Sequence, residues 1–132
     1  MMAAGAKNLV GMQALEAFDA YIAISPQGVG TIFPKDAWSD LRMPVLSITG
    51  TRDAELGGTS WQSRTQPFQN MPAGCKWLGV VDGATHMNFA GTLLSSPAEV
   101  LTVQAIGAFL QGVHDGSCRL PAAVAGLTLT AR

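Results

Sequence analysis

Residues 43–53, MPVLSITGTRD, contain the stretch that decides the fold of this chain. Their central part, VLSIT at residues 45–49, is a continuous apolar run. Two similar runs lie on either side of it along the chain, AYIAIS at residues 20–25 and WLGVV at residues 77–81. Continuous rather than alternating apolar runs are typical of parallel strands that are covered on both faces. The sequence therefore predicts three buried strands.

The segments between these runs have helical character. Residues 1–16 are rich in alanine, methionine and leucine, and residues 59–70 predict a short helix that is interrupted at Pro67. Strands that alternate with helices predict an α/β fold, here a small, mostly parallel sheet flanked by helices. All 132 residues fit a single domain, which is long enough to bury a core. The tail, residues 114–132, includes VAGLTLT, which fits either an edge strand or a surface arm.

The clearest helix signal lies at residues 97–112. Ser96 and Glu99 form a capping box, and a proline occupies the first helical position between them. Apolar residues then follow at spacings of three and four, which is typical of a stripe that faces the core. The residues of this expected stripe are Val103, Ile106, Leu110 and Val113.

Composition and charge exclude several classes of function. The net charge of -1 indicates neither a nucleic-acid-binding face nor an anchor to an anionic membrane. No apolar run approaches the roughly 18 residues that a membrane span needs. The amino terminus lacks the basic start and long apolar block of a signal peptide. The sequence thus predicts a soluble chain and leaves its compartment open.

The residues that commonly bind metals are not arranged as a metal site. Cys75 and Cys118 permit a disulfide without requiring one. The cysteines, the two histidines (His86 and His114) and the acids lack the close pairing that is typical of structural zinc sites. The glycines do not form a phosphate-binding motif at the start of a helix. We therefore expect no metal and no cofactor.

Two titratable residues follow consecutive predicted strands. Asp53 comes after VLSITGTR, and His86 comes after WLGVVDGAT. Taken alone, Asp53 is typical of a turn and His86 of a packed or surface histidine. Together they are more informative, because parallel sheets place their chemistry at the carboxyl ends of the strands. A carboxylate that orients a histidine, which then acts as a general base, requires both groups at that edge.

The stretches that carry this pair resemble parts of the α/β-hydrolase superfamily, in particular esterases and dienelactone hydrolases. MPVLSITGTRD resembles the penultimate strand, with Asp53 in the place of the catalytic acid. VVDGATHMNFAG, residues 80–91, resembles the last strand and its loop, with His86 in the place of the catalytic histidine. AFDAYIAISPQG resembles the strand before the acid-bearing one. The resemblance covers residues 1–113 and implies a small ester as the substrate.

The nucleophile that this resemblance implies is missing. The family raises its serine on a G-x-S-x-G turn, and no such pentapeptide occurs in the sequence. MMAAGAKN resembles the helix that follows this turn, so the chain corresponds to the carboxyl-terminal half of a hydrolase. Ser25 is a candidate substitute at a strand end, but Pro26 supplies no N–H for an oxyanion, and a structural role is the simpler interpretation. Trp61 is the best candidate to line a substrate cleft, although core packing is the more common role of an aromatic residue.

Two hypotheses follow for the function. In the first, the chain is part of a serine ester hydrolase that is inactive alone and needs the missing amino-terminal half. In the second, it is a non-catalytic domain that keeps the hydrolase half-fold and self-associates. A cut after the nucleophile strand leaves one edge of residues 20–25 open and predicts a homodimer. The same cut uncovers apolar residues of the first segment, namely Leu9, Val10, Met12 and Leu15.

Overall fold

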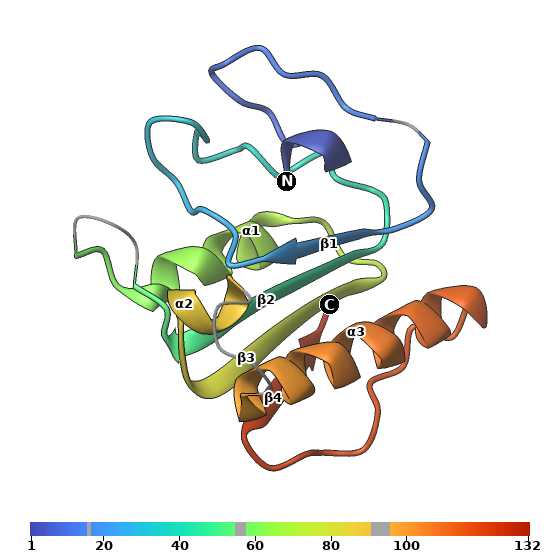
Figure 1. Ribbon diagram of the computed structural model, residues 1–132. Coiled ribbons are helices and arrows are strands. Elements are labelled where there is room, and N and C mark those ends of the chain that lie inside the picture. The colour runs from blue at the N-terminus through green and yellow to red at the C-terminus, as the bar shows by residue number, and fades with distance from the viewer. Residues whose placement is uncertain (16, 55–57, 91–95) are drawn as a thin grey trace.

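Across the described part of the chain, four strands form one mixed sheet in the order β1-β2-β3-β4 (Figure 1). The first three strands are parallel, and β4 is antiparallel to β3. This computed structural model describes residues 1–15, 17–54, 58–90 and 96–132. The strands are Tyr21–Ile24 (β1), Val45–Arg52 (β2), Lys76–Thr85 (β3) and Leu127–Ala131 (β4).

The three apolar runs of the sequence are the three parallel strands, so the predicted α/β class is confirmed. β2 and β3 extend past the predicted runs, and β3 continues to Thr85. The VAGLTLT tail, for which two conformations were compatible with the sequence, forms the edge strand β4. Leu127 of this strand pairs with Val81 of β3. The sheet is therefore mostly parallel, with one antiparallel edge.

The long helix α3, Pro97–His114, covers one face of the sheet (Figure 1). The side chain of Ser96 accepts a hydrogen bond from the Glu99 N–H at 3.2 Å, and Pro97 lies in the first turn, as the sequence predicts. Phe109 of the helix packs against Trp77 of β3 in an edge-to-face contact, with ring centroids 5.5 Å apart.

Within the described ranges, no helix has the length and apolar character that crossing a membrane demands.

The expected core stripe of α3 is confirmed only in part: Ile106 and Val113 pack against the core cluster, whereas Val103 and Leu110 are exposed. Val103 and Leu110 are 62% and 47% exposed, while Ile106 and Val113 are only partly buried. The buried positions are Ala98, Thr102, Ala105, Phe109 and Gly112. Both sets repeat at spacings of three and four, so periodicity alone does not choose between them. The small residues of the buried set let the helix approach closely: a Cβ added at Gly112 would lie 3.6 Å from the Trp77 ring.

The expected helix at residues 1–16 is wrong over residues 1–15; Glu16 lies outside the described residues. Only the 3-10 turn η1, Met2–Ala4, is helical, and it ends at Gly5 with φ 95°. The Asn8 side chain binds both backbone groups of Met12, its Oδ1 accepting from the N–H at 2.9 Å. Asparagine side chains that bind nearby backbone offer the chain an alternative to a helix. Good helix formers in this segment are thus overridden by local hydrogen bonds and by glycine.

The second face of the sheet is covered by segments with little regular structure. Figure 1 shows η1 and the loops before β2 on the side opposite α3. Their buried side chains form a cluster with the first residue of β2 and with Met71, which lies between β2 and β3: Ala4, Ala6, Phe33, Ala37, Trp38, Leu41, Val45 and Met71. Layers therefore cover both faces, as the fold class predicts, but an irregular chain replaces one of the expected helices.

The predicted helix at residues 59–70 consists of two short elements. A 3-10 helix, η2, spans Trp61–Thr65, and the α-helix α1 spans Gln66–Asn70. Pro67 lies in the first turn of α1, where its missing N–H has no intrahelical partner to lose. The proline therefore begins the second element rather than breaking the first. This arrangement places Arg64, in the last turn of η2, next to the carboxyl end of β2.

Cys75 and Cys118, for which the sequence left pairing open, form a disulfide. It joins the residue before β3 to the segment that follows α3. The indole N–H of Trp77 also donates to the Cys118 carbonyl at 3.2 Å. The tail that forms β4 is therefore anchored near its start at Cys118, and at its end by the pairing of β4 with β3.

Replacing both cysteines by serine is expected to lower the free energy of unfolding. A cross-link between residues 43 apart restricts the unfolded chain by about 4 kcal/mol in the chain-entropy description. Urea unfolding without reductant measures the loss. Reductant should reproduce it in the parent chain and have no effect on the double variant, and equal midpoints for parent and variant would contradict a stabilising disulfide.

Candidate active site

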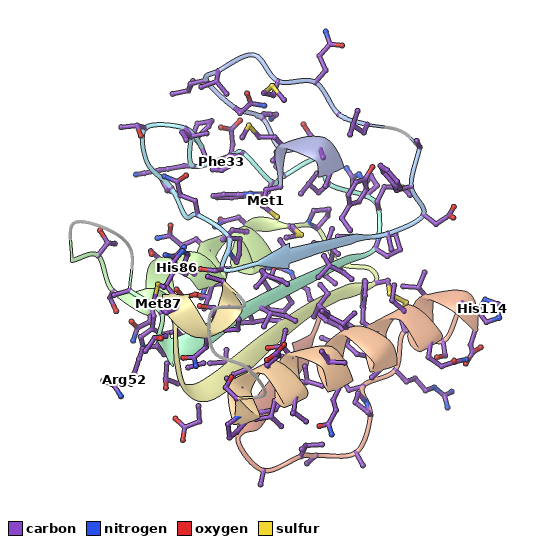
Figure 2. The ribbon with its side chains drawn as sticks, in the orientation of Figure 1. Met1, Phe33, Arg52, His86, Met87 and His114 are labelled. Carbon is purple, nitrogen blue, oxygen red and sulfur yellow. A yellow bond between two sulfur atoms is a disulfide. The ribbon has the colours of Figure 1, made fainter. Side chains whose placement is uncertain are left out.

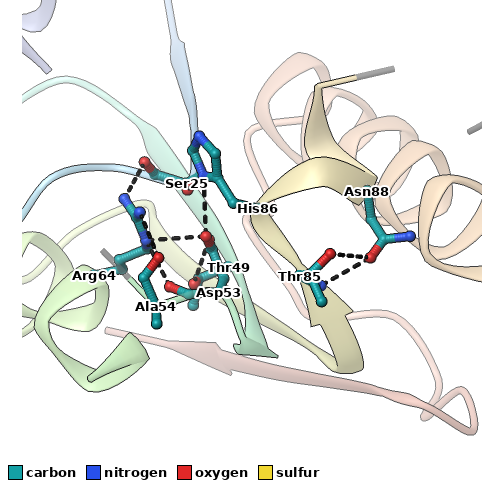
Figure 3. Close-up of polar contacts among 8 residues, drawn as sticks. All are labelled: Ser25, Thr49, Asp53, Ala54, Arg64, Thr85, His86 and Asn88. Atoms are coloured by element: carbon teal, nitrogen blue, oxygen red, sulfur yellow. Dashed lines mark hydrogen bonds and ion pairs between the residues drawn. The ribbon is translucent and has the colours of Figure 1, made fainter. Parts of the chain in front are cut away.

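Asp53 follows β2 directly and is fully buried at the carboxyl end of the sheet. Its carboxylate has three side-chain partners (Figure 3). The Thr49 hydroxyl donates to Oδ2 at 3.0 Å, and Arg64 Nε lies 3.1 Å from Oδ1. His86 Nδ1 lies 3.1 Å from the same Oδ1 atom. The prediction that Asp53 and His86 lie within hydrogen-bond reach is therefore confirmed.

A register shift between β2 and β3 brings His86 to this position. Gly50 pairs with Val81, but Arg52 pairs with Thr85, so β3 contains extra residues over this interval. His86, the next residue after Thr85, begins the one-turn helix α2, His86–Phe89. Without the shift, the strand would continue past the edge where Asp53 lies. The irregularity thus aims the imidazole back toward the end of β2.

Two glycines allow the irregular part of β3. A Cβ added at Gly50 would lie 2.3 Å from the Ala84 carbonyl oxygen, so the two strands approach too closely there for any side chain. Gly83 has φ 69°, a backbone conformation that glycine adopts readily. The Thr51 hydroxyl accepts from the Gly83 N–H at 2.7 Å and donates to Asp82 at 3.1 Å. The extra residues are thereby held in one conformation.

The turn that carries His86 is capped by its own side chains. The N–H and hydroxyl of Thr85 both donate to Asn88 Oδ1, each at 2.8 Å (Figure 3). The Thr85 side chain also accepts from the Asn88 N–H; together with the bond from the Thr85 N–H this forms a capping box, which fixes where the chain leaves β3. The His86 side chain is 57% exposed, in contrast to its buried partner Asp53. The site therefore combines a buried acid with an imidazole that reaches solvent.

The partners of His86 assign the protonation of its ring. A carboxylate only accepts hydrogen bonds, so the nitrogen that faces Asp53 carries the proton in the neutral ring. That nitrogen is Nδ1, which leaves Nε2 unprotonated and basic. The arrangement can take a proton at Nε2 and stabilise the resulting cation with the carboxylate.

Ser25 lies immediately after β1 and also contacts the imidazole. Its Oγ is 2.9 Å from Nδ1, the same nitrogen that faces Asp53 (Figure 3). Because Nδ1 carries the proton, Ser25 Oγ is placed to accept a share of that hydrogen bond. Deprotonation of Ser25 by His86 would require the free lone pair of Nε2, which is on the other side of the ring. The geometry thus favours an accepting role for Ser25 over the substitute nucleophile considered from the sequence.

Arg64 joins the ends of two strands. Its Nε donates to the Asp53 carbonyl oxygen at 2.7 Å and also faces the Asp53 carboxylate. Nη1 donates to the carbonyl of Ser25 at 3.0 Å, and Nη2 to that of Ala54 at 3.3 Å. The guanidinium is almost completely buried. Arginine presents several donors in a planar fork, which suits it to bind a carboxylate and several carbonyls together.

Sequence reasoning missed Arg64 and Thr49. Arg64 is brought to Asp53 by the η2 turn, and no motif marks an arginine 11 residues after an acid as its partner. Thr49 belongs to the apolar run of β2, where the sequence pattern predicts only a strand residue. A fully buried aspartate requires compensating donors, so burial of Asp53 is the signal that would have prompted a search for them.

Among the described residues, Trp61 takes no part in the polar contacts of Asp53 and His86. It opens η2 and is half-buried, and no hydrogen bond or ring contact joins it to Asp53, His86 or Ser25. Its place in a substrate cleft therefore stays a prediction. Among the described residues, no group of three or more histidine, cysteine, aspartate or glutamate side chains is arranged to hold a metal ion.

Comparisons of the chain with family models, with curated proteins and with solved structures gave no match. The geometry of the described residues is therefore the basis for interpreting this site.

Replacing Arg64 by methionine is expected to destabilise the fold strongly. The change leaves the buried Asp53 carboxylate without its cation, and breaking a buried pair in this way costs about 3–5 kcal/mol. Urea unfolding followed by circular dichroism measures the loss.

Arg52 provides the matched control for this substitution. It ends β2 at the same edge of the sheet, and Figure 2 shows its side chain pointing away from the molecule. Arg52→Met should change the free energy of unfolding by no more than about 0.5 kcal/mol. Similar effects of the two substitutions would argue against a special role for the Arg64 pair.

Proposed function

We propose that this chain supplies the acid and the base of a serine ester hydrolase of the α/β-hydrolase type. Asp53 is the orienting acid, and His86 is the general base that acts through Nε2. The nucleophilic serine belongs to a segment outside these 132 residues. A small carboxylic ester is the proposed substrate, by resemblance to esterases and dienelactone hydrolases.

The observation that carries this proposal is the Asp53–His86 contact at the carboxyl end of adjacent parallel strands. The carboxylate selects the Nδ1–H tautomer, and this leaves Nε2 as the basic nitrogen toward solvent. A serine hydroxyl brought to Nε2 would lose its proton there while its oxygen attacks an ester carbonyl. Asp53 would remain ionised and stabilise the imidazolium. Burial of Asp53 strengthens this effect, because charges interact more strongly away from water.

The pair alone is insufficient for rapid ester hydrolysis. Removing the serine from a complete triad lowers turnover by about 10⁶-fold, since no acyl intermediate forms. Ser25 does not restore the missing parts, because it faces the protonated nitrogen and Pro26 has no N–H to offer an oxyanion. The chain by itself is therefore expected to lack esterase activity.

This expectation is tested with p-nitrophenyl acetate. Neither the parent chain nor its His86→Ala variant should turn the ester over faster than free imidazole at the same concentration does, because neither has an activated serine nucleophile. A faster rate in the parent that the substitution abolishes would contradict the assignment of the nucleophile to another segment. Ser25→Ala would then show whether Ser25 is that nucleophile.

The positive arm of the test uses the coding frame upstream of Met1. If this frame continues and encodes a G-x-S-x-G turn, the extended chain should hydrolyse the ester. His86→Ala in that chain should lower turnover by about 10⁶-fold and Asp53→Asn by about 10⁴-fold. An extended chain that is active but insensitive to both substitutions would overturn the proposed roles.

The exposed apolar surface supports a second candidate function, that of a self-associating domain. Leu9, Val10, Met12 and Leu15 are all more than half exposed. β1 pairs with β2 alone in the described sheet, and the N–H groups of Tyr21 and Ser25 donate toward β2. The alternation of a strand then directs the N–H groups of Ile22 and Ile24 to the open edge. An open edge of this kind is a template for pairing with a second chain.

A homodimer is therefore expected in sedimentation equilibrium at micromolar concentration. A twofold interface of about 800 Å² per partner would cover the edge and the apolar segment. Ile22→Lys at the edge should shift the equilibrium toward monomer, while Leu120→Lys, at an equally exposed site in the tail, should not. A single species at 13.7 kDa in the parent would contradict self-association.

A further inference from the structure

Ser25 is held at each of its polar groups. Its N–H donates to the Ile48 carbonyl at 2.7 Å, and its own carbonyl accepts from Arg64 at 3.0 Å. Its hydroxyl oxygen lies 2.9 Å from His86 Nδ1. The residue therefore links the end of β1 to β2, to η2 and to α2.

The backbone of Ser25 is strained. Its φ is 51°, in the left-handed region that residues other than glycine seldom adopt. The following residue, Pro26, restricts the conformations of Ser25 further. Strained backbone persists where the surrounding contacts determine it, and it is concentrated at functional sites. Here the conformation directs the hydroxyl toward the imidazole.

We propose that Ser25 is a positioning residue for His86. The Asp53 contact restrains Nδ1 from one side only, so coupled changes in the two side-chain torsions of His86, χ1 and χ2, can still tilt the ring and move Nε2. A second acceptor on the same nitrogen, in a different direction, restricts this tilting. Ser25 thereby holds Nε2 in one direction at the edge of the sheet. The role of Nε2 as a base in that direction rests on the proposed function, whereas the contact between Ser25 and His86 does not.

The test compares Ser25→Gly with Ser25→Ala by nuclear magnetic resonance on the purified chain. Both variants remove the hydroxyl, but glycine accepts φ 51° without strain whereas alanine does not. The readouts are the ring tautomer of His86 and the rate at which its Nδ1–H exchanges with water. His114, exposed at the end of α3, is the internal control in the same spectra.

In the parent chain, His86 is expected as the Nδ1–H tautomer. Both variants should keep this tautomer, because Asp53 remains, and should exchange the proton about five-fold faster, the factor that one ordinary hydrogen bond supplies. Signals of His114 should not change. Ser25→Gly should also be at least as stable as the parent, which separates loss of the hydroxyl from loss of the fold.

Other outcomes overturn the inference in distinguishable ways. Unchanged exchange in both variants, or a change in Ser25→Ala alone, would assign Ser25 a backbone role and leave the proposed function intact. An Nε2–H tautomer in the parent would overturn both proposals. Covalent labelling of Ser25 by a fluorophosphonate probe would make it a nucleophile instead of a positioning residue.

Discussion

The buried ion pair of Asp53 and Arg64 is the interaction on which the carboxyl end of this sheet depends. A carboxylate with no exposed surface is tolerated only when donors replace the water that it has lost. Arg64 supplies a charge and, through its remaining donors, binds the carbonyls of Ser25 and Ala54. One guanidinium therefore neutralises the acid and also connects the chain after β1 to the chain after β2.

His86 is positioned by this anchored acid and by the shape of β3. The close approach at Gly50 and the left-handed conformation at Gly83 let β3 bulge, so that the histidine arrives beside Asp53. The carboxylate then selects the ring tautomer, and Ser25 contacts the same nitrogen from the end of β1. Groups from two neighbouring strand ends thus act on an imidazole that the end of the third strand carries.

Much of the fold was predictable because it follows from local patterns. Continuous apolar runs marked the three parallel strands, and the cap at Ser96 marked the start of α3. The face of α3 was predicted only in part, because Val103 and Phe109 belong to two stripes with the same period. Close packing on Trp77 favours the stripe with small residues, and sequence periodicity contains no information on the distance between layers. The amino-terminal segment failed as a helix because glycine and the Asn8 side chain outweigh helix propensity.

The sequence by itself determined the class of the fold, the strand ends that carry Asp53 and His86, and the absence of a G-x-S-x-G turn. These are properties of short stretches of sequence. Because β2 and β3 are adjacent parallel strands, the residues at their ends, Asp53 and His86, become neighbours. Only the tertiary structure decided that Arg64 neutralises Asp53 and that Ser25 faces the protonated nitrogen of His86. Such contacts depend on how closely segments far apart in the chain approach one another, here to 3.1 Å and 2.9 Å. Burial then decides the strength of the Asp53–Arg64 interaction, because two charges attract more strongly when little water surrounds them.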